Sequence, residues 1–202
     1  MMKMRYLLAL LLFISIVPLH SCTSSRAEES KTIKEGKGRL EISFNFHRGG
    51  IASSQYAIWI EDENGKLVRT IYATSFTVKG GYEYREDAIP MWVDKAKPQQ
   101  MTSAQVDAVT GATPSNGNLV YQWDGRDDKG VRVPAGKYKF FIEGTLHWKS
   151  RILYSGDFVW GKNTQSFIPF KVEYFNRSSA NEDMITGLKV IILRNELQTF
   201  KF

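Results

Sequence analysis

The segment Asp107–Thr113 has two hydroxyls on either side of a Gly-Ala step, and it reads Asp-Ala-Val-Thr-Gly-Ala-Thr. Gly111 and the alanine after it leave room beside the hydroxyls of Thr110 and Thr113. Pro114 biases Thr113 toward an extended backbone, which helps its oxygen project from the chain. A hydroxyl presented in this way can enter the active site of a second enzyme and form an ester. The alternative is that the stretch is only an irregular turn before the next strand.

Three carboxylates crowd into five positions at Asp124, Asp127 and Asp128, which raises the question of a calcium loop. The spacing of an EF-hand loop is absent, because the twelfth position counted from Asp124 is Ala135 rather than a glutamate. We therefore interpret these aspartates as turn residues. Outside the first 21 residues only His47 and His147 remain as histidines, too few for a zinc or haem site, so we expect no metal.

No set of residues for enzymatic catalysis can be assembled from the chain. The glycine pairs at Gly49 and Gly80 lack the Lys-Ser and the strand-to-helix context of a phosphate loop, and no nucleophile elbow is present. We expect a protein that is not an enzyme. An enzyme acting on cell-envelope polymers is the least supported alternative.

The first 21 residues have the order typical of an export signal. Lys3 and Arg5 supply a positive start, and Leu7–Val17 is an apolar run too short to span a bilayer. The next four residues, Leu-His-Ser-Cys, resemble a bacterial lipobox, in which the cysteine becomes diacylated and begins the mature chain. Cys22 is the sole cysteine, so it has no partner for an internal disulfide. We expect Cys22 to carry lipid, with an ordinary signal peptide and a free thiol as the alternative.

Composition divides the rest of the chain into a tether and one domain. Residues 22–38 are mostly Ser, Glu, Lys and Gly, which is typical of a flexible tether, and residues 39–202 are long enough for one core. The formal net charge is +6 and the lysines are scattered, so nucleic-acid binding is not indicated. Two or three acyl chains on Cys22 would hold this domain on the periplasmic side of a bacterial membrane, inner or outer.

Alternating apolar residues predict about eight short strands. Leu40, Ile42 and Phe44 alternate with polar residues, and Asn64-Gly65 predicts a two-residue hairpin turn. The expected strands are Arg39–Phe46, Tyr56–Glu61, Lys66–Val78, Leu119–Trp123, Lys137–Gly144, Ser166–Tyr174 and Gly187–Arg194, with His147–Tyr154 and Asp157–Trp160 as further strand pieces.

Two short helices interrupt the strand pattern. Helical spacing in Tyr82–Lys97 predicts one, with Asp87 as its cap and Pro90 in its first turn. A weaker pattern in Ser103–Val109 predicts a second, with Thr102 capping it. Together with the strands, these features predict a mainly β protein, an immunoglobulin-like β-sandwich with one or two short helices in an insertion.

One hairpin carries a resemblance to a known domain. The loop Trp123–Gly130 and the segment Val133–Tyr138 resemble the penultimate hairpin of the immunoglobulin-like domain in flagellar hook-capping proteins and many secreted β-modules. In such domains the Asp and Gly residues shape the turn, and the Trp and Tyr fill the core. We therefore expect Trp123, Tyr138 and Phe140 in the core.

The order of features along Arg39–Phe158 is similar to a family of predicted periplasmic proteins of unknown function. That family is associated with flavin transferases and with membrane reductases that have PepSY-type periplasmic domains. The segment Asp107–Thr113 also resembles the acceptor sequence of extracytoplasmic flavin transferases: an Asp, two variable residues, Ser or Thr, then Gly-Ala-Thr. The resemblance implies a covalent flavin mononucleotide (FMN) on Thr113, with Asp107, Thr110 and Gly111 completing the motif.

Two classes of function remain open. The first is a non-enzymatic lipoprotein of the cell envelope in periplasmic flavin-linked electron transfer, either carrying FMN at Thr113 or partnering a flavinylated reductase. Its expected partners are the membrane, a flavin transferase and a membrane reductase. The second is a structural, adhesion or ligand-binding sandwich module with no cofactor.

Overall fold

The computed structural model describes residues 38–48, 54–147, 149–161, 166–177 and 184–193. All of them belong to one unit of the chain, residues 33–202. The expected signal peptide, residues 1–21, and the expected tether up to residue 37 lie outside these ranges. Cys22 lies outside them as well, so its lipidation stays a prediction.

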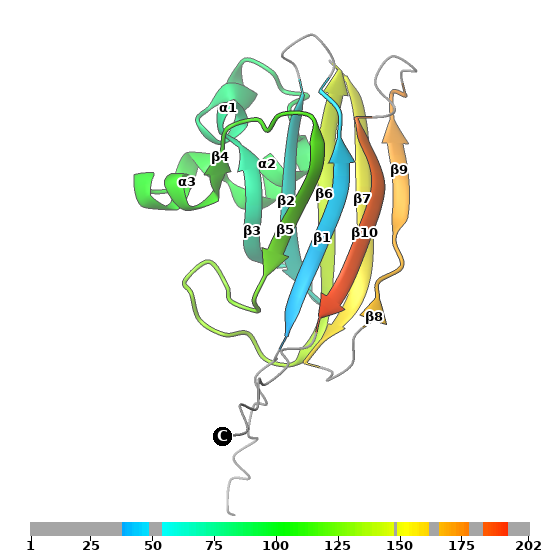
Figure 1. The fold of residues 1–202 in the computed structure, drawn as a ribbon. Helices are drawn as coiled ribbons and strands as arrows, with labels where there is room; N and C mark the ends of the chain where they lie inside the picture. The colour runs from blue at the N-terminus through cyan, green and yellow to red at the C-terminus, as the bar shows by residue number, and fades with distance from the viewer. Residues whose placement is uncertain (1–37, 49–53, 148, 162–165, 178–183, 194–202) are drawn as a thin grey trace, which may run out of the picture. The chain divides into compact units, whose positions relative to one another are not determined.

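Ten strands among the described residues form two stacked sheets (Figure 1). The smaller sheet has the order β5-β1-β10-β8, with bounds β1 Arg39–Phe46, β5 Gly117–Trp123, β8 Ser166–Phe167 and β10 Ile185–Leu193. The larger has the order β4-β3-β2-β6-β7-β9, with bounds β2 Gln55–Asp62, β3 Leu67–Thr74, β4 Thr110–Gly111, β6 Gly136–His147, β7 Ser150–Trp160 and β9 Lys171–Phe175. Among these described strands, β3 and β4 pair in parallel and the other pairs are antiparallel.

The main core lies between the two sheets and follows from the period of two along each strand. In β1, Leu40 and Ile42 point inward while Glu41 and Ser43 point outward. Core residues come from both sheets, so the two inner faces bury each other. The expected mainly β sandwich is confirmed.

The hairpin resembling a known domain contributes as expected to this core. Trp123, Tyr138 and Phe140 are all buried there. The Trp123 ring lies 4.7 Å from the Trp160 ring and 5.8 Å from the Tyr138 ring, centroid to centroid. The prediction that these three side chains fill the core is therefore confirmed.

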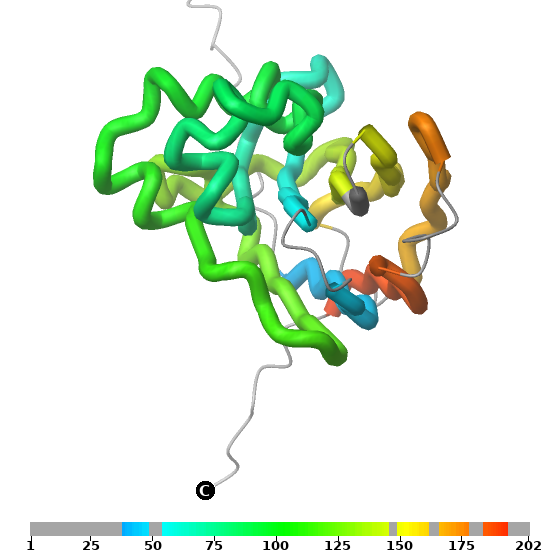
Figure 2. Tube along the Cα trace, turned by 90° about the horizontal axis from the view of Figure 1, so that it is seen from above, coloured from blue at the N-terminus to red at the C-terminus, as the bar shows by residue number. Residues whose placement is uncertain are grey.

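A second apolar cluster lies on the outer face of the larger sheet, under the helical insertion between β3 and β4. The insertion contains α1 (Ser75–Val78), α2 (Pro90–Ala96), α3 (Ser103–Val109) and 3-10 turns at Gly81–Glu83 and Pro98–Gln100. Trp92 of α2 and Trp59 of β2 are both buried in this cluster. Strand β2 is consequently buried on both faces. Figure 2 shows the insertion in green on one side and β9 in orange on the other.

The helix expected within Tyr82–Lys97 is α2. Its N-terminus is capped by a residue of strand β6 rather than by Asp87, which corrects the expectation. α2 begins after Ile89, and Glu143 of β6 accepts hydrogen bonds from the backbone N–H groups of Met91 at 3.3 Å and Trp92 at 2.9 Å. Asp87 instead pairs with Arg85 at 2.9 Å. The acceptor comes from a residue more than 50 positions away, so helix-end patterns in the sequence could not reveal it.

The helix expected over Ser103–Val109 is α3, and it matches its prediction. α3 spans Ser103–Val109, and the Thr102 side chain accepts from the backbone N–H of Gln105. The Gln105 side chain in turn accepts from the backbone N–H of Thr102 at 2.8 Å. This reciprocal capping box satisfies two N–H groups at the start of the helix.

Several strand ends differ from expectation. The strand expected to reach Val78 ends at Thr74, because a helical turn brings Val78 into the outer-face cluster. The two pieces expected between residues 147 and 160 are one strand, β7. The strand expected over residues 166–174 is divided into β8 and β9 around Pro169, where the chain passes from one sheet to the other.

The β2–β3 turn has a three-residue loop rather than the expected two-residue loop. The Asp62 backbone N–H bonds to the Lys66 carbonyl at 3.0 Å, and Gly65 has a φ of 76°. The Asp62 side chain also accepts from the N–H groups of Asn64 and Lys66. Glycine thus takes the left-handed position that a three-residue hairpin loop requires.

Candidate functional site

The segment Asp107–Thr113 links α3 to the edge of the larger sheet. Val109, the last residue of α3, is buried, whereas Asp107 two residues earlier is exposed. The next two residues form β4, in which Thr110 pairs with Ala73 of β3. The motif therefore begins on a helix, continues as an edge strand and ends in residues 112–116, which form neither helix nor strand.

Tyr72 of β3 holds the middle of the motif. Its hydroxyl donates a hydrogen bond to the carbonyl of Ala112 at 2.9 Å, with a longer contact of 3.4 Å to the carbonyl of Gly111. A Cβ atom added to Gly111 would lie 2.4 Å from the Tyr72 ring, so only glycine fits there. The backbone before Thr113 is thus fixed by contacts rather than freely pliable.

Thr113 itself is half-buried, and it directly follows Gly111 and Ala112, the two residues that Tyr72 holds in place. Among the residues that the structure describes, none hydrogen-bonds its hydroxyl or that of Thr110. Ala112 and Ser115 on either side of Thr113 and Pro114 are exposed. At the far end of the loop, the Asn116 side chain accepts from the backbone N–H of Arg48 at 2.7 Å.

The structure does not bring the motif residues together as a cluster. Within the described ranges, no hydrogen bond joins Asp107 to either threonine. Asp107 lies on the exposed face of α3, so it is available for contact with another protein but does not orient the Thr113 hydroxyl. The roles of Asp107, Thr110, Gly111 and Thr113 in flavin attachment stay predictions.

Three tyrosines under this loop were not recognised in the sequence. Tyr56 of β2, Tyr72 of β3 and Tyr121 of β5 come from both sheets, and the hydroxyls of Tyr56 and Tyr121 are hydrogen-bonded at 2.5 Å. The Tyr56 and Tyr72 rings stack at 4.8 Å, and the Tyr72 and Tyr121 rings lie 5.1 Å apart. Each tyrosine is an inward-facing residue of an alternating strand, so only the sheet pairing reveals the cluster.

Burial determines the protonation of these tyrosines. Desolvation is the main cause that raises the pKa of Tyr72 to about 12, and it raises the pKa values of Tyr56 and Tyr121 as well. All three phenols therefore keep their protons at neutral pH. Tyr72 consequently acts as a hydrogen-bond donor to the loop before Thr113.

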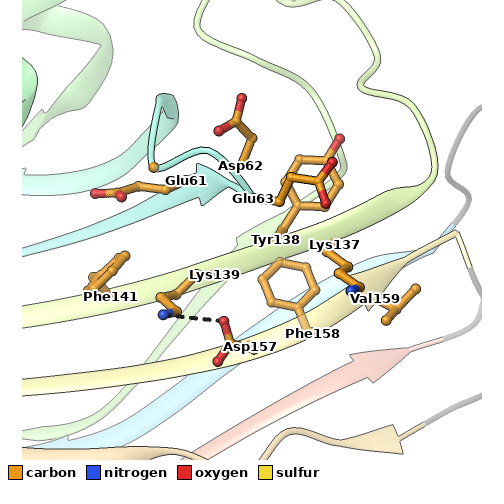
Figure 3. A pocket seen from close by; sticks show the side chains of 11 residues that line it. Glu61, Asp62, Glu63, Lys137, Tyr138, Lys139, Phe141, Asp157, Phe158 and Val159 are labelled. Atoms are coloured by element: carbon orange, nitrogen blue, oxygen red, sulfur yellow. Dashed lines mark ion pairs between the residues drawn. The ribbon is translucent and has the colours of Figure 1, made fainter.

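A separate groove of about 640 Å³ lies over β6 and β7 beside the β2–β3 turn (Figure 3). Phe141 lies in it, with its ring stacked 5.0 Å from the buried ring of Trp59. Lys139 pairs with Asp157 at 3.3 Å, and its ammonium lies 6.0 Å from the centre of the Phe141 ring. Glu61 is held by Lys95 at 3.3 Å.

The groove offers an aromatic surface bordered by charges of both signs. Glu61 and Asp157 are already paired with lysines, and Asp62 closes the neighbouring turn. These charged groups can contact a polar ligand but do not form an acid–base pair directed at a common point. The groove therefore offers a surface to which a ligand could bind.

The three clustered aspartates have structural partners, as the turn interpretation predicted. Asp127 accepts from the N–H groups of Lys129 at 2.9 Å and Val131 at 2.8 Å. Asp128 accepts from the N–H of Thr70 on β3, and Asp124 pairs with the following arginine. Within the described ranges, no group of three or more His, Cys, Asp or Glu side chains is arranged to hold a metal ion.

Residues 38–172 match the model of a protein family described as "Predicted periplasmic protein (DUF2271)". The chain belongs to that family. This DUF2271 protein is thus a member of a periplasmic family, and within the described residues no helix has the length and apolar character needed to cross a membrane. No curated protein matches it.

Two solved structures are similar to this DUF2271 protein, both of truncated FlgD (monoclinic form) from the human pathogen Helicobacter pylori. The first is 18% identical, covers 76% of this chain and 83% of the other, and has a TM-score of 0.33. The second, from strain 26695, is 18% identical, covers 77% and 84%, and has a TM-score of 0.32. Scores of this size do not establish a shared fold.

Proposed function

We propose that this periplasmic-family protein is a lipid-anchored, non-enzymatic β-sandwich that takes part in flavin-linked electron transfer and carries one FMN on Thr113. Cys22 supplies the anchor, and the sandwich presents the acceptor loop. A flavin transferase attaches the flavin, and a membrane reductase is the redox partner. When bound, FMN would supply the one- and two-electron chemistry.

The observation that carries the proposal is the hydroxyl of Thr113 at the end of a segment held by Tyr72. Ester formation by another enzyme needs an oxygen that is accessible and has no competing partner. Thr113 is partly exposed, and no described residue hydrogen-bonds its hydroxyl. The exposed neighbours Ala112 and Ser115 leave space for a bulky substituent, so these residues fit the group.

The reaction at this chain is simple. In the transferase active site, the Thr113 oxygen attacks the FMN phosphate of flavin adenine dinucleotide, and a new O–P bond forms. The phosphoanhydride bond breaks and adenosine monophosphate leaves, while the hydroxyl proton passes to a base of the transferase. The sandwich contributes the position of the hydroxyl, because Tyr72 fixes the backbone up to Ala112.

Intact-mass analysis of the exported protein, co-produced with a flavin transferase, tests the proposal. We expect a mass increase of one FMN less one water that is absent in Thr113→Ala and retained in Ser115→Ala, which removes an exposed hydroxyl two residues away. A protein without flavin, or one whose flavin persists in Thr113→Ala, would contradict the proposal. In that case the protein is better sought as a partner of a flavinylated reductase.

The groove in Figure 3 favours a second candidate function, a ligand-binding module without a cofactor. Its aromatic surface at Phe141 suits stacking against a flat or ring-shaped group, and Lys139 and Asp157 offer polar contacts. Phe141→Ala separates the two candidates. It should abolish ligand binding in the second but leave the flavin content unchanged in the first.

A further inference from the structure

Exposed apolar side chains gather on one short part of the chain. Nine large apolar side chains are exposed among the described residues, and four of them lie within residues 167–174: Phe167 at 74%, Phe170 at 39%, Val172 at 41% and Tyr174 at 38%. The other five are scattered over residues 76–131. Single exposed apolar residues are ordinary on a protein surface, whereas a concentration of them indicates a contact surface.

This concentration coincides with an open sheet edge. β9 is the last strand of the larger sheet, paired with β7 on one side only, and Figure 1 shows it as the outermost strand there. Backbone N–H and C=O groups on its other side can pair with a further strand. The strand has no proline, and no residue of the described part of the chain pairs with its outer side.

The exposed residues of β9 continue a row of core residues. Val172 lies opposite Tyr154 and Tyr174 lies opposite Ile152, so they share the inward face of β7. The facing sheet ends beyond β10 in β8, which pairs through only two residues. Val172 and Tyr174 therefore face inward, and in the part of the chain that the structure describes no strand of the smaller sheet covers them fully, although Arg177 stacks on the Tyr174 ring at 4.6 Å.

The sequence of β9 is complementary to itself in one register. If two copies pair antiparallel about Val172, Lys171 of each copy lies opposite Glu173 of the other. The same register places Val172 opposite Val172 and Phe170 opposite Tyr174. Two ion pairs and three apolar pairs then lie across the junction, because two-fold symmetry makes each contact between two different residues occur twice.

We propose that β9 is a docking edge for a second copy of this chain, joined antiparallel about Val172 so that the larger sheets of two protomers form one continuous sheet. The pairing covers Phe170, Val172 and Tyr174 and satisfies the free backbone groups of β9. It leaves the loop around Thr113 uncovered, because that loop lies at the opposite edge of the larger sheet, beside β4. The proposal is independent of flavin attachment.

Charge exchange tests the register. The full exported chain, made soluble by Cys22→Ser, should sediment as a dimer at micromolar concentration. Lys171→Glu and Glu173→Lys each place like charges opposite each other twice, and each should weaken the dimer by about tenfold or more. The double exchange restores opposite charges and should restore the dimer. A monomeric starting protein, or a double variant no better than the single ones, overturns the proposal.

A cross-link tests the same register independently of charge. Directly opposite residues in antiparallel strands have Cα atoms about 4.5 or 5.5 Å apart, within disulfide range in either case. In the Cys22→Ser background, Val172→Cys should therefore give a disulfide-linked dimer on mild oxidation. The matched control is Val131→Cys, on an exposed valine of a loop outside β9, and it should form no disulfide-linked dimer. Equal cross-linking of both variants, or of neither, contradicts the pairing about Val172.

Discussion

At the scale of single residues, Tyr72 connects the core to the acceptor loop. Its ring stacks on Tyr56 inside the sandwich, while its hydroxyl donates to the Ala112 carbonyl just before Thr113. It is also the reason why position 111 must be glycine, because a Cβ there would overlap the ring. A change at Tyr72 therefore affects stability and loop position together.

Tyr72→Phe should lower the free energy of unfolding by about 1 kcal/mol at neutral pH, because the hydrogen bond to Ala112 is lost and ring packing is kept. Burial raises the Tyr72 pKa from 10.0 to about 12, so the folded state holds this proton more tightly than the unfolded state. The resulting stabilisation is complete below the unfolded pKa and is lost as pH rises through about 12.

Denaturant unfolding at about pH 8 and about pH 11.5 measures this effect. The difference between wild type and Tyr72→Phe should shrink toward the higher pH, because the wild-type contribution fades there. Tyr84→Phe is the control, since Tyr84 is exposed and should leave the unfolding free energy unchanged at neutral pH. A difference that stays constant over this range would show that Tyr72 ionisation is not linked to folding.

At the scale of elements, α2 depends on a strand that lies far away in the sequence. Glu143 of β6 is fully buried, accepts from two N–H groups at the start of α2 and pairs with Arg151 of β7 at 2.7 Å. Burial raises the pKa of Glu143, while the contacts from Trp92 and Arg151 act in the opposite direction. This single carboxylate therefore connects the helical insertion to the middle of the larger sheet.

Glu143→Ala should destabilise the protein by about 3–5 kcal/mol, because it leaves the mostly buried Arg151 without its anion and two helix N–H groups without an acceptor. Asp87→Ala is the control and should cost less than about 1 kcal/mol, because its main partner is a nearby arginine. Chemical denaturation of both variants measures the difference. Equal costs would mean that Asp87, as first expected, contributes to holding α2.

At the scale of the whole molecule, two apolar clusters share the larger sheet. One fills the space between the sheets, and the other lies under the helical insertion on the outer face. Trp123 lies at the end of β5 and belongs to the cluster between the sheets. Its indole N–H donates a hydrogen bond to the Arg126 carbonyl at 2.7 Å. The aspartate-rich loop is thus fixed to the core by the residue that precedes it.

Trp123→Ala should cost about 3–5 kcal/mol, since it removes a buried indole and leaves a cavity against Trp160. Val120→Ala, three residues earlier on the same strand and exposed, should change stability by less than about 0.5 kcal/mol. Thermal or denaturant unfolding checks both. If the two variants unfold alike, Trp123 is not part of the cooperative core.

Lipid anchoring is a property of the whole protein in the cell. Wild-type protein should fractionate with membranes and start at Cys22, whereas Cys22→Ser should appear in the soluble periplasmic fraction, because acyl chains alone provide the expected attachment. Fractionation with N-terminal mass analysis measures both properties. A soluble wild type with a different N-terminus would leave Cys22 as an ordinary thiol.

Local patterns of residues are enough to predict the mainly β class and much of the local structure. Alternation along Arg39–Phe46 identifies a strand with one buried face, and Thr102 with Gln105 identifies the start of α3. These features depend on residues within a few positions of each other, so the local pattern contains the information. The membership of Tyr138 and Phe140 in the core agrees with the alternation of their own strand, and that of Trp123 with the resemblance of its hairpin to a known domain.

Features built from residues that are distant in the sequence could not be predicted and become visible in the folded protein. The tyrosine cluster joins β2, β3 and β5, the cap of α2 comes from Glu143, and the fixed backbone before Thr113 depends on Tyr72. The open edge at β9 likewise appears only once Pro169 divides the expected strand between two sheets. Each depends on which strands pair and in what register, and the energies that decide pairing come from many weak contacts that no short segment contains.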